Sequence, residues 1–261
     1  MPLKDSRKYM KILLTNDDGV HAKGLWALYK RLAKDNFVTV VAPDRERSAI
    51  GHGITIYQPL RKKLITVNGG FKAYATNGTP ADCIKFGILE ILGEKPDMVI
   101  SGINPGANIG VNINYSGTVA AAREAALYGI NALAVSIHGF DPKNYDAAAC
   151  YIEKISKIVY AKGLFKGTFL NINLPDIPLE KMRGVHISKQ GLDHHDQYFE
   201  KRVDPKNRAY YWQNVDIKPV FDDTDVDGAA LNNNFISITP IKCDMTDYQM
   251  INNLKKWQID I

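Results

Sequence analysis

Residues 98–129 read MVISGINPGANIGVNINYSGTVAAAREAALYG, and this stretch decides the fold. Its apolar start, residues 98–100, predicts a buried parallel strand. Its Ala-rich end predicts a helix that Gly129 stops. Residues 101–114 between them hold four asparagines, three glycines and one proline. Because such a composition is too polar and too kinked for a core element, we expect a loop whose backbone can approach a ligand closely.

The start of the predicted helix carries Ser116, Gly117 and Thr118. Free backbone N–H groups and the helix dipole at such a position favour an anion. Asn108 lies in the preceding loop, and its side chain offers a donor and an acceptor without charge. We therefore expect this segment to hold a phosphate group. The alternative is that these residues only shape a turn and cap the helix, and one residue can do both.

Composition and charge narrow the class of protein. The 261 residues are 45% hydrophobic and 23% charged, as in soluble globular proteins. The net charge of +5 is mild and the basic residues are scattered, which argues against a nucleic-acid partner. An apolar run long enough to span a membrane and an apolar N-terminal signal are both absent from the sequence. Three widely spaced cysteines without a C-x-x-C motif suggest a reducing compartment, so we expect a cytoplasmic protein without membrane contact.

The rest of the chain alternates strand-like and helix-like segments. The expected strands are residues 12–14, 38–43, 54–60, 71–76, 132–137 and 169–174, and the expected helices are 24–34, 79–92 and 146–161. This β-α-β alternation predicts a parallel sheet with right-handed crossovers. The segment 54–60 is expected to pair with 71–76 around the turn at 68–70. After residue 175 the rhythm changes to β-like runs at 184–187 and 235–240 and a final helix from about 246.

Three polar loops follow expected strands, at residues 16–19, 44–53 and 101–118. Ligands of open parallel sheets bind outside the carboxyl ends of the strands, so these loops should converge on one cleft.

The adjacent acids Asp17 and Asp18 in the first loop suit a hard divalent cation such as Mg²⁺ or Mn²⁺. Ser48 and Asn104 in the other two loops would add neutral oxygen ligands. The alternatives are turn and capping roles for the acids, and local backbone hydrogen bonds for Ser48 and Asn104.

Several weaker signals remain open or are set aside. His52 flanks the expected cleft and is either a general acid or a structural residue. His194 and His195, with flanking acids, are either a metal patch or an exposed loop. Residues 223–228 imitate the first half of an EF-hand, but Asn234 stands where calcium needs a glutamate.

The phosphate-binding motifs of other nucleotide proteins are missing. A G-x-G-x-x-G motif after the first strand, typical of dinucleotide-dependent oxidoreductases, is absent, and so is the P-loop motif.

Five ordered segments of the chain are distinctive in combination: LTNDDG (14–19), APDRERS (42–48), NGTPADC (77–83), SGINPGANIG (101–110) and YSGTVAAARE (115–124). Together they closely resemble the survival protein SurE family. The resemblance covers most of residues 11–175 and reappears at 224–229 and 236–240.

The resemblance implies a fold class and a domain organisation. The fold would be α/β, a three-layer Rossmann-like arrangement of a mostly parallel sheet with helices on both faces. A β-rich C-terminal arm and a helix would follow it. We expect a single domain over residues 1–261, with a core at about 11–175 and an extension at about 176–261. The extension would join copies into a homodimer or homotetramer.

The resemblance also implies an activity, a metal-dependent 5'-nucleotidase that hydrolyses nucleoside 5'- and, as a finer expectation, 3'-monophosphates. One divalent ion per subunit, Mg²⁺ or Mn²⁺, would be held by Asp17, Asp18, Ser48 and Asn104. Asp17, Asp18 and Asn104 would be the catalytic residues. The substrate and its phosphate would lie against a further set: Asn16, Asn108, Ser116, Gly117 and Thr118.

The chemistry expected of this set is attack by a metal-activated water on the phosphorus. Backbone N–H groups at residues 116–118 would stabilise the phosphoryl oxygens. The sequence leaves open which carboxylate accepts a proton. The alternative function is a non-catalytic module that binds nucleotides or phosphate.

Overall fold

A computed structural model gives the fold and describes residues 9–67, 69–192, 197–215, 221, 223–257 and 259. Two expectations concern residues outside these ranges: Asn68 in the turn at 68–70, and the pair His194 and His195.

The helices and strands follow the expected alternation closely. The strands are β1 (Lys11–Thr15), β2 (Phe37–Pro43), β3 (Lys62–Val67), β4 (Phe71–Thr76), β5 (Met98–Pro105), β6 (Asn131–Ile137), β7 (Thr168–Leu174), β8 (Val185–Ile187), β9 (Gln197–Val203), β10 (Ala209–Val215) and β11 (Ile236–Lys242). The α-helices are α1 (Lys23–Leu32), α2 (Pro80–Phe86), α3 (Gly117–Leu127), α4 (Tyr145–Lys162), α5 (Asp227–Asn232) and α6 (Tyr248–Leu254). A π-helical segment, Gly87–Leu92, continues α2, and 3-10 turns occupy Gly110–Asn114 and Leu179–Lys181.

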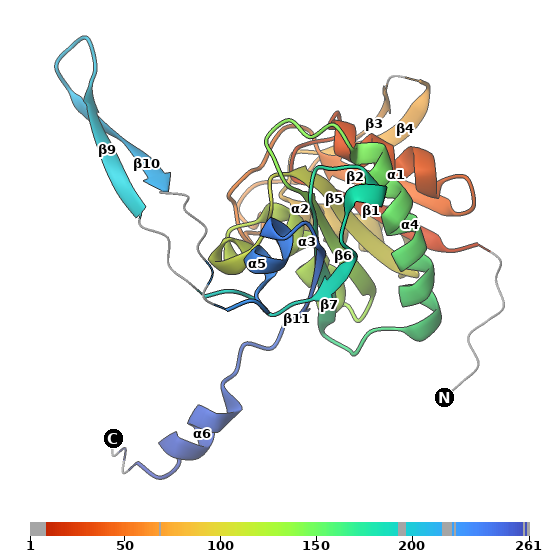
Figure 1. The fold of residues 1–261 in the computed structure, drawn as a ribbon. Coiled ribbons are helices and arrows are strands. Elements are labelled where there is room, and N and C mark those ends of the chain that lie inside the picture. Colours follow the sequence, from red (N-terminus) through yellow and green to blue (C-terminus); the bar gives the residue numbers. More distant parts are fainter. Residues whose placement is uncertain are drawn as a thin grey trace.

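Nine strands form one sheet in the order β3-β4-β2-β1-β5-β6-β7-β11-β8 (Figure 1). In this spatial order, the six strands from β4 to β7 all run parallel to one another. Strand β3 is antiparallel to its neighbour β4, and β11 is antiparallel to its neighbour β7. The chain leaves β1 toward β2 on one side, and β5 lies on the other side of β1. The strand order therefore reverses between β1 and β5, which makes the carboxyl ends of these two strands the topological switch point.

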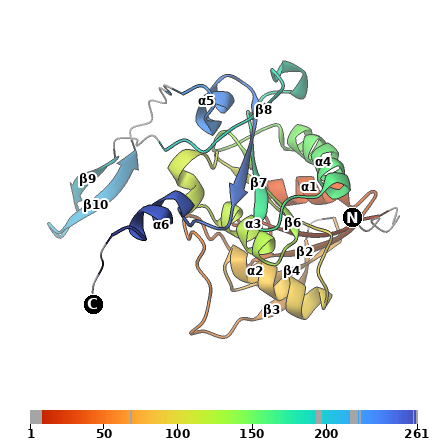
Figure 2. The ribbon, with the colours of Figure 1, turned by 90° about the horizontal axis from the view of Figure 1, so that it is seen from below.

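Helices cover both faces of the sheet (Figure 2). Alternate residues of β1 show how the layers are built, because successive strand side chains point to opposite faces. Ile12 and Leu14 pack in the core beneath α1 and α4, whereas Leu13 packs in the core beneath α2 and α3. This is the expected three-layer α/β fold, and that prediction is confirmed. None of the described helices is long and apolar enough to cross a membrane.

The prediction of a strand at residues 54–60 was wrong. Residues 54–60 are irregular, and the partner of β4 is instead β3, at Lys62–Val67. The backbone of the irregular segment bonds to side chains rather than to a strand. The Thr55 amide donates to Asp82, and the Pro59 carbonyl accepts from Asn77. Pro59 itself lacks the N–H group that a ladder needs.

The loop expected from residue 101 also begins later than predicted, because β5 continues to Pro105. Its pairing with β6 shifts register between Ser101 and Asn104. Gly102 makes this possible, with φ at +137° and a backbone so close to β6 that an added Cβ would lie 2.3 Å from the carbonyl oxygen of Val135. Only glycine tolerates both conditions.

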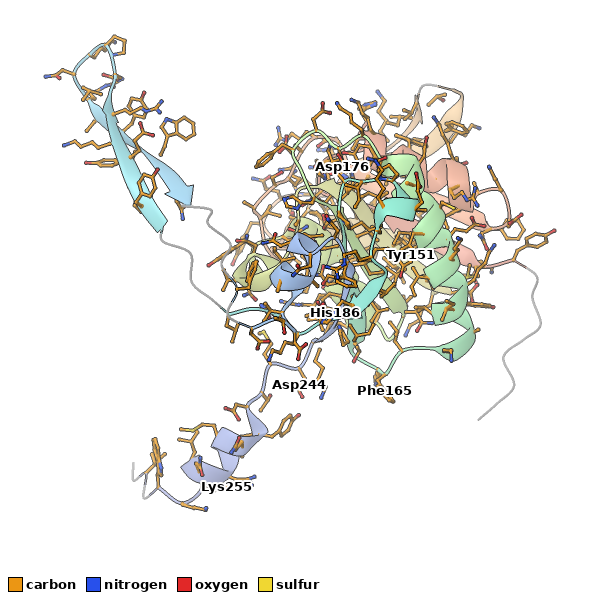
Figure 3. All side chains as sticks on the ribbon, viewed as in Figure 1. Tyr151, Phe165, Asp176, His186, Asp244 and Lys255 are labelled. Carbon is orange, nitrogen blue, oxygen red and sulfur yellow. The ribbon has the colours of Figure 1, made fainter. Side chains whose placement is uncertain are left out.

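The segment after residue 175 divides into two parts. Strands β8 and β11 join the main sheet, and α5 packs against β11 and β7. The hairpin of β9 and β10 and the helix α6 project from this body, and Asp244 and Lys255 mark the segment that carries α6 (Figures 1 and 3). The expected β-rich arm and final helix are therefore present, and part of the extension completes the core sheet.

Candidate active site

The three polar loops meet at the switch point. The Arg47 amide donates to the carbonyl oxygen of Asp17 at 2.7 Å, which fastens the loop after β2 to the loop after β1. The Gly51 amide donates to the carbonyl oxygen of Tyr115 at 2.9 Å, which fastens it to the loop after β5. Residues far apart in sequence are thereby brought to one place, as the strand topology requires.

Asp17 lies at the centre of the region where the three loops meet, with 4% of its surface exposed. The hydroxyl of Thr118, in the first turn of α3, donates to Asp17 Oδ1 at 2.5 Å. Burial raises the pKa of Asp17, while hydrogen bonds from the Thr118 hydroxyl and from backbone amides partly oppose that rise. The carboxylate therefore occupies a site where a nearby cation would favour its charged form.

Gly117 allows Asp17 to approach the start of α3. A Cβ added at Gly117 would lie 2.8 Å from Asp17 Cβ, 3.0 Å from Asp17 Oδ2 and 3.1 Å from Pro80 Cγ. Contacts shorter than 3.0 Å are essentially never made by real Cβ atoms. The expected Gly117 therefore makes room for the carboxylate of Asp17.

Asp18 is the second carboxylate of the pair. Burial, with the negative charges of Asp17 and Glu46, raises the pKa of Asp18 to about 7. Its Oδ2 atom is buried without a hydrogen-bond partner, and so is Oδ1 of Asn16. Unpaired buried oxygens are costly. Two buried oxygens without hydrogen-bond partners, both just after β1, indicate that a positively charged group belongs at this position.

The residues present fit a hard divalent cation. The donors would be carboxylate oxygens of Asp17 and Asp18 with the neutral oxygens of Ser48 and Asn104, which is the chemistry that Mg²⁺ and Mn²⁺ prefer. Asn104 uses its Nδ2 to donate to the carbonyls of Pro105 and Gly106, which leaves its Oδ1 as the atom for a ligand role. Ser48 is exposed and donates to Glu46. Asp17 and Asp18 are the only acidic side chains in this donor set, and within the described residues His, Cys, Asp and Glu form no cluster of three or more that could hold a metal ion.

The start of α3 has the features of an anion site and of a cap together. The side chain of Ser116 accepts from the Val119 amide and so caps the helix. Thr118 directs its hydroxyl at Asp17. The capping alternative therefore holds for Ser116, and Thr118 has a function in orienting a candidate metal ligand that the sequence did not reveal.

Asn108 belongs to a buried polar network that the sequence analysis missed. Its side-chain Nδ2 donates to Ser136 Oγ at 2.8 Å, and its backbone N–H donates to Asn173 Oδ1 at 2.8 Å. Its carbonyl oxygen accepts from Nδ2 of both Asn171 and Asn173. This network anchors the loop after β5 to β6 and β7. Two alternating asparagines in an otherwise apolar strand were the available signal.

A second set of contacts holds the loop after β2 over α2 and α3. His52 Nε2 lies 2.8 Å from Glu124 Oε2 in the middle of α3, and Lys85 lies 3.4 Å from Glu124 Oε1. Burial alone would raise the pKa of Glu124, but the His52 hydrogen bond and the Lys85 charge outweigh it, so the pKa lies below the ordinary value of 4.5. In this structure His52 has a structural partner.

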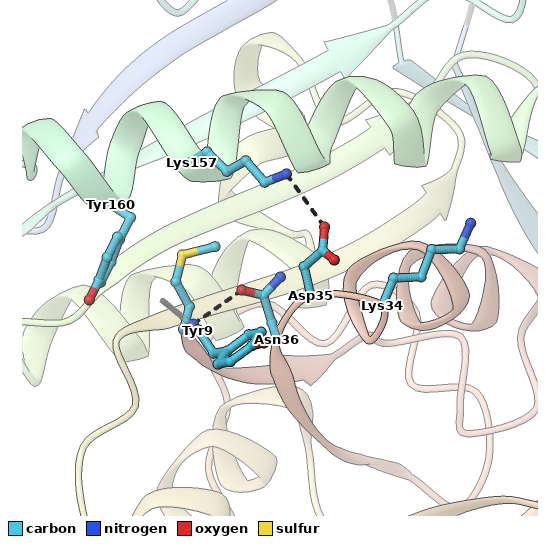
Figure 4. Close-up of a pocket in the computed structure, with 7 residues that line it drawn as sticks. Tyr9, Lys34, Asp35, Asn36, Lys157 and Tyr160 are labelled. Atoms are coloured by element: carbon cyan, nitrogen blue, oxygen red, sulfur yellow. Dashed lines mark hydrogen bonds and ion pairs between the residues drawn. The ribbon is translucent and has the colours of Figure 1, made fainter. Parts of the chain in front are cut away.

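Two cavities differ in their relation to the site. A cleft of about 290 Å³ adjoins it, lined by residues that include Arg45, Arg47, Ile50 and Asn77. A larger cavity of about 540 Å³ lies between Asn36 and Lys157, near the amino ends of β1 and β2 (Figure 4). Because ligands of such sheets bind at the carboxyl ends, the smaller cleft is the one next to the candidate chemistry.

Comparison with known proteins shows the family of the chain. The model of the family "Survival protein SurE" matches residues 12–197. The chain belongs to the SurE family. One SurE relative, named 5'-nucleotidase SurE, comes from Desulfatibacillum aliphaticivorans. It is 53% identical over 251 residues, covering 96% of this chain and 99% of the relative. A protein of the same name from Syntrophobacter fumaroxidans is 46% identical, covering 96% and 100%.

A solved structure agrees with the SurE fold. The crystal structure of the SurE protein from Aquifex aeolicus matches with a TM-score of 0.83 at 36% identity, covering 94% of this chain and 98% of that chain. The nine-stranded sheet described above is therefore that of a SurE protein.

Proposed function

We propose that this SurE protein is a divalent-metal-dependent phosphomonoesterase that releases phosphate from nucleoside 5'-monophosphates and, as a finer proposal, from 3'-monophosphates. It is an enzyme of the 5'-nucleotidase class, the name borne by relatives that match nearly its full length. The observation that carries the metal dependence is the pair of adjacent carboxylates, buried Asp17 and half-buried Asp18, with raised pKa values, beside the start of α3.

In the proposed reaction the cation would be held by Asp17, Asp18, Ser48 and Asn104. When bound, such a cation supplies Lewis acidity that makes the phosphorus more electrophilic and a water more acidic. Thr118 holds Asp17 in a fixed orientation through its hydroxyl. The backbone at Gly117 and Thr118, at the positive end of the α3 dipole, would face the phosphoryl oxygens. The oxygen of a water molecule bonds to the phosphorus as the P–O ester bond breaks, and one proton of that water ends on the released nucleoside oxygen while the other stays on the phosphate.

The test is phosphate release from 5'-AMP and 3'-AMP by metal-stripped protein, with Mg²⁺ or Mn²⁺ added back. Asp18→Asn is assayed beside the parent, and circular dichroism checks that both are folded. We expect turnover that needs the ion and is lost in the variant. A folded protein that binds AMP but releases no phosphate with either ion would favour the non-catalytic binding module.

We also propose that copies of the chain form a homodimer or homotetramer through the C-terminal arm. Large hydrophobic side chains are exposed on both faces of the hairpin, with Phe199 at 68% exposure and Trp212 at 57%. Exposed apolar surface of this extent is typical of an interface. Light scattering after chromatography should show a smaller assembly for Phe199→Ser with Trp212→Ser. Phe165→Ser, which alters an exposed ring outside the arm, is the control.

The cytoplasm is the proposed location. Cys83, Cys150 and Cys243 are all free thiols, which is typical of proteins in a reducing compartment. Fractionation of the source cells would test this directly.

A further inference from the structure

Gly110, in the loop after β5, is held by the C-terminal extension through both of its main-chain polar groups. Its amide donates to Asp227 Oδ2 at 2.9 Å. Its carbonyl oxygen accepts from Nε2 of Gln190 at 2.8 Å. Both partners come from the part of the chain after residue 175, more than 70 residues away in sequence.

The carboxylate of Asp227 is fully buried and is satisfied by backbone amides. Besides Gly110, its Oδ1 accepts from the amides of Gly191 at 3.2 Å and Gly228 at 2.9 Å. Its side chain has 0% exposure. Both carboxylate oxygens therefore act only as acceptors, and each faces an N–H group. An asparagine at this position would direct its side-chain NH₂ group, a donor, toward at least one of these backbone N–H groups, which are also donors.

The segment around Asp227 is itself firmly placed. The Lys189 amide donates to the carbonyl oxygen of Asp225 at 3.0 Å, and the Asp227 amide donates to the carbonyl oxygen of Lys189 at 2.9 Å. Residues 189–191 and 225–227 thus lie side by side like a short piece of sheet, with a bridge between Lys189 and Val226. Asp227 presents its carboxylate to Gly110 from a rigid support.

The position of Gly110 bears directly on the start of α3. Gly110 opens the 3-10 turn that runs to Asn114. The amides of Tyr115 and Ser116 both donate to the carbonyl oxygen of Asn112 within that turn. Ser116 then caps α3, whose next residues are Gly117 and Thr118. One short, hydrogen-bonded path therefore joins Gly110 to the candidate phosphate site.

We propose that Asp227 is a positioning residue for the phosphate site and acts through Gly110 and the turn that precedes α3. Gln190 makes the second side-chain hydrogen bond that holds Gly110. The proposal rests on the proposed function. The C-terminal extension then has two roles: it positions the phosphate site through Asp227 and Gln190, and it carries the arm. Asp227 touches neither substrate nor metal in this account. Its effect should fall on phosphate affinity more than on metal affinity.

The experiment uses the full-length protein and three single variants. Asp227→Asn removes one acceptor and places a donor opposite an N–H group. Gln190→Ala removes the second hydrogen bond and leaves Asp227 intact. Asp225→Asn is the matched control, because Asp225 is an exposed carboxylate two residues away, 3.7 Å from the ring of His186.

The readouts are the affinity for inorganic phosphate by calorimetry with Mn²⁺ present, the affinity for Mn²⁺ alone, and KM and kcat with 5'-AMP. We expect Asp227→Asn to weaken phosphate binding and raise KM by about tenfold or more, as for loss of a buried hydrogen bond to a charged group. Gln190→Ala should act in the same direction by a smaller factor. The Mn²⁺ affinity of each variant and all values of Asp225→Asn should stay within about twofold of the parent.

Two results would overturn the proposal. One is a folded Asp227→Asn protein that melts at a lower temperature but keeps parental phosphate affinity and KM, which is the behaviour of a merely structural residue. If Asp227→Asn fails to fold, Gln190→Ala decides, and parental phosphate affinity in that variant would equally exclude the account. Failure of the parent itself to bind phosphate or release it from 5'-AMP would count against the proposed function instead.

Discussion

The hydroxyl of Thr118 donates to Asp17 Oδ1 at 2.5 Å, joining residues 101 positions apart in the sequence. Thr118 belongs to the first turn of α3, whereas Asp17 follows β1. The contact brings the helix that would receive the phosphate against a carboxylate that would hold the metal. The two halves of the candidate site are therefore linked by one buried hydrogen bond.

Removal of the Thr118 hydroxyl should lower activity without unfolding the protein. Thr118→Val keeps the shape of the side chain but leaves Asp17 Oδ1 without this donor. Hydrogen bonds to charged groups contribute about 1.5–3 kcal/mol, so we expect kcat/KM with 5'-AMP to fall about tenfold to a hundredfold at saturating Mn²⁺. Thr118→Ser retains the hydroxyl and should recover most of the activity. Equal activity of the valine and serine variants would contradict this function of the hydrogen bond.

A methyl group at Gly117 should displace Asp17. The added Cβ of Gly117→Ala would lie 2.8 Å from Asp17 Cβ, so the carboxylate or the start of α3 must move. We expect weaker Mn²⁺ binding and a loss of kcat of about a hundredfold or more, because small displacements of catalytic groups are costly.

Gly53→Ala is the matched control for that variant. Its added Cβ would make only an ordinary contact, 3.4 Å from the carbonyl oxygen of Ile50. Its activity, measured by phosphate release, should stay close to that of the parent. A fully active Gly117→Ala protein would show that Asp17 does not need this space.

Glu124 should stabilise the protein in a pH-dependent way. Its pKa in the folded protein lies below the ordinary value of 4.5, because the His52 hydrogen bond and the Lys85 charge outweigh the effect of burial. A depressed pKa means that the stabilisation is complete above the unfolded pKa and is lost as pH falls through the folded one. Glu124→Gln should therefore lower the free energy of unfolding by about 1–2 kcal/mol at pH 7.

That difference from the parent should shrink as the pH falls below 4.5, as urea unfolding followed by tryptophan fluorescence would show. Glu90→Gln, at an exposed position, should change the free energy of unfolding by less than about 0.5 kcal/mol. A difference for Glu124→Gln that stays constant or grows as the pH falls below 4.5 would contradict the assignment.

Local chemistry in the sequence was sufficient to predict the elements that position the site. The run Thr79-Pro80-Ala81-Asp82 predicted the start of α2, and the structure shows the full capping box, with Asp82 and Thr79 bonding to each other's amides. The Asp17 and Asp18 pair after a buried strand likewise predicted a polar site at the sheet edge. Caps, turns and strand ends are governed by neighbouring residues, so one sequence suffices for them.

Contacts between distant segments could not be predicted in this way. Nothing near Asn108 in the sequence indicates that Asn173 accepts its amide hydrogen, 65 residues away. The same holds for His52 and Glu124, and for Gly110 and Asp227. The late end of β5 depends on how closely Gly102 approaches β6, which is a property of the packed sheet. Each of these features exists only once the sheet has formed.

We propose that the pair Asp17 and Asp18 holds the ion on which turnover depends. The most direct measurement titrates metal-stripped protein with Mn²⁺ and follows two quantities in the same samples. Bound Mn²⁺ is followed by electron paramagnetic resonance, and phosphate release from 5'-AMP is assayed in parallel. We predict one site per chain, activity that rises in proportion to its occupancy, and a parallel loss of both in folded Asp18→Asn. Full activity in the stripped protein, or undiminished turnover by Asp18→Asn without bound Mn²⁺, would contradict the account.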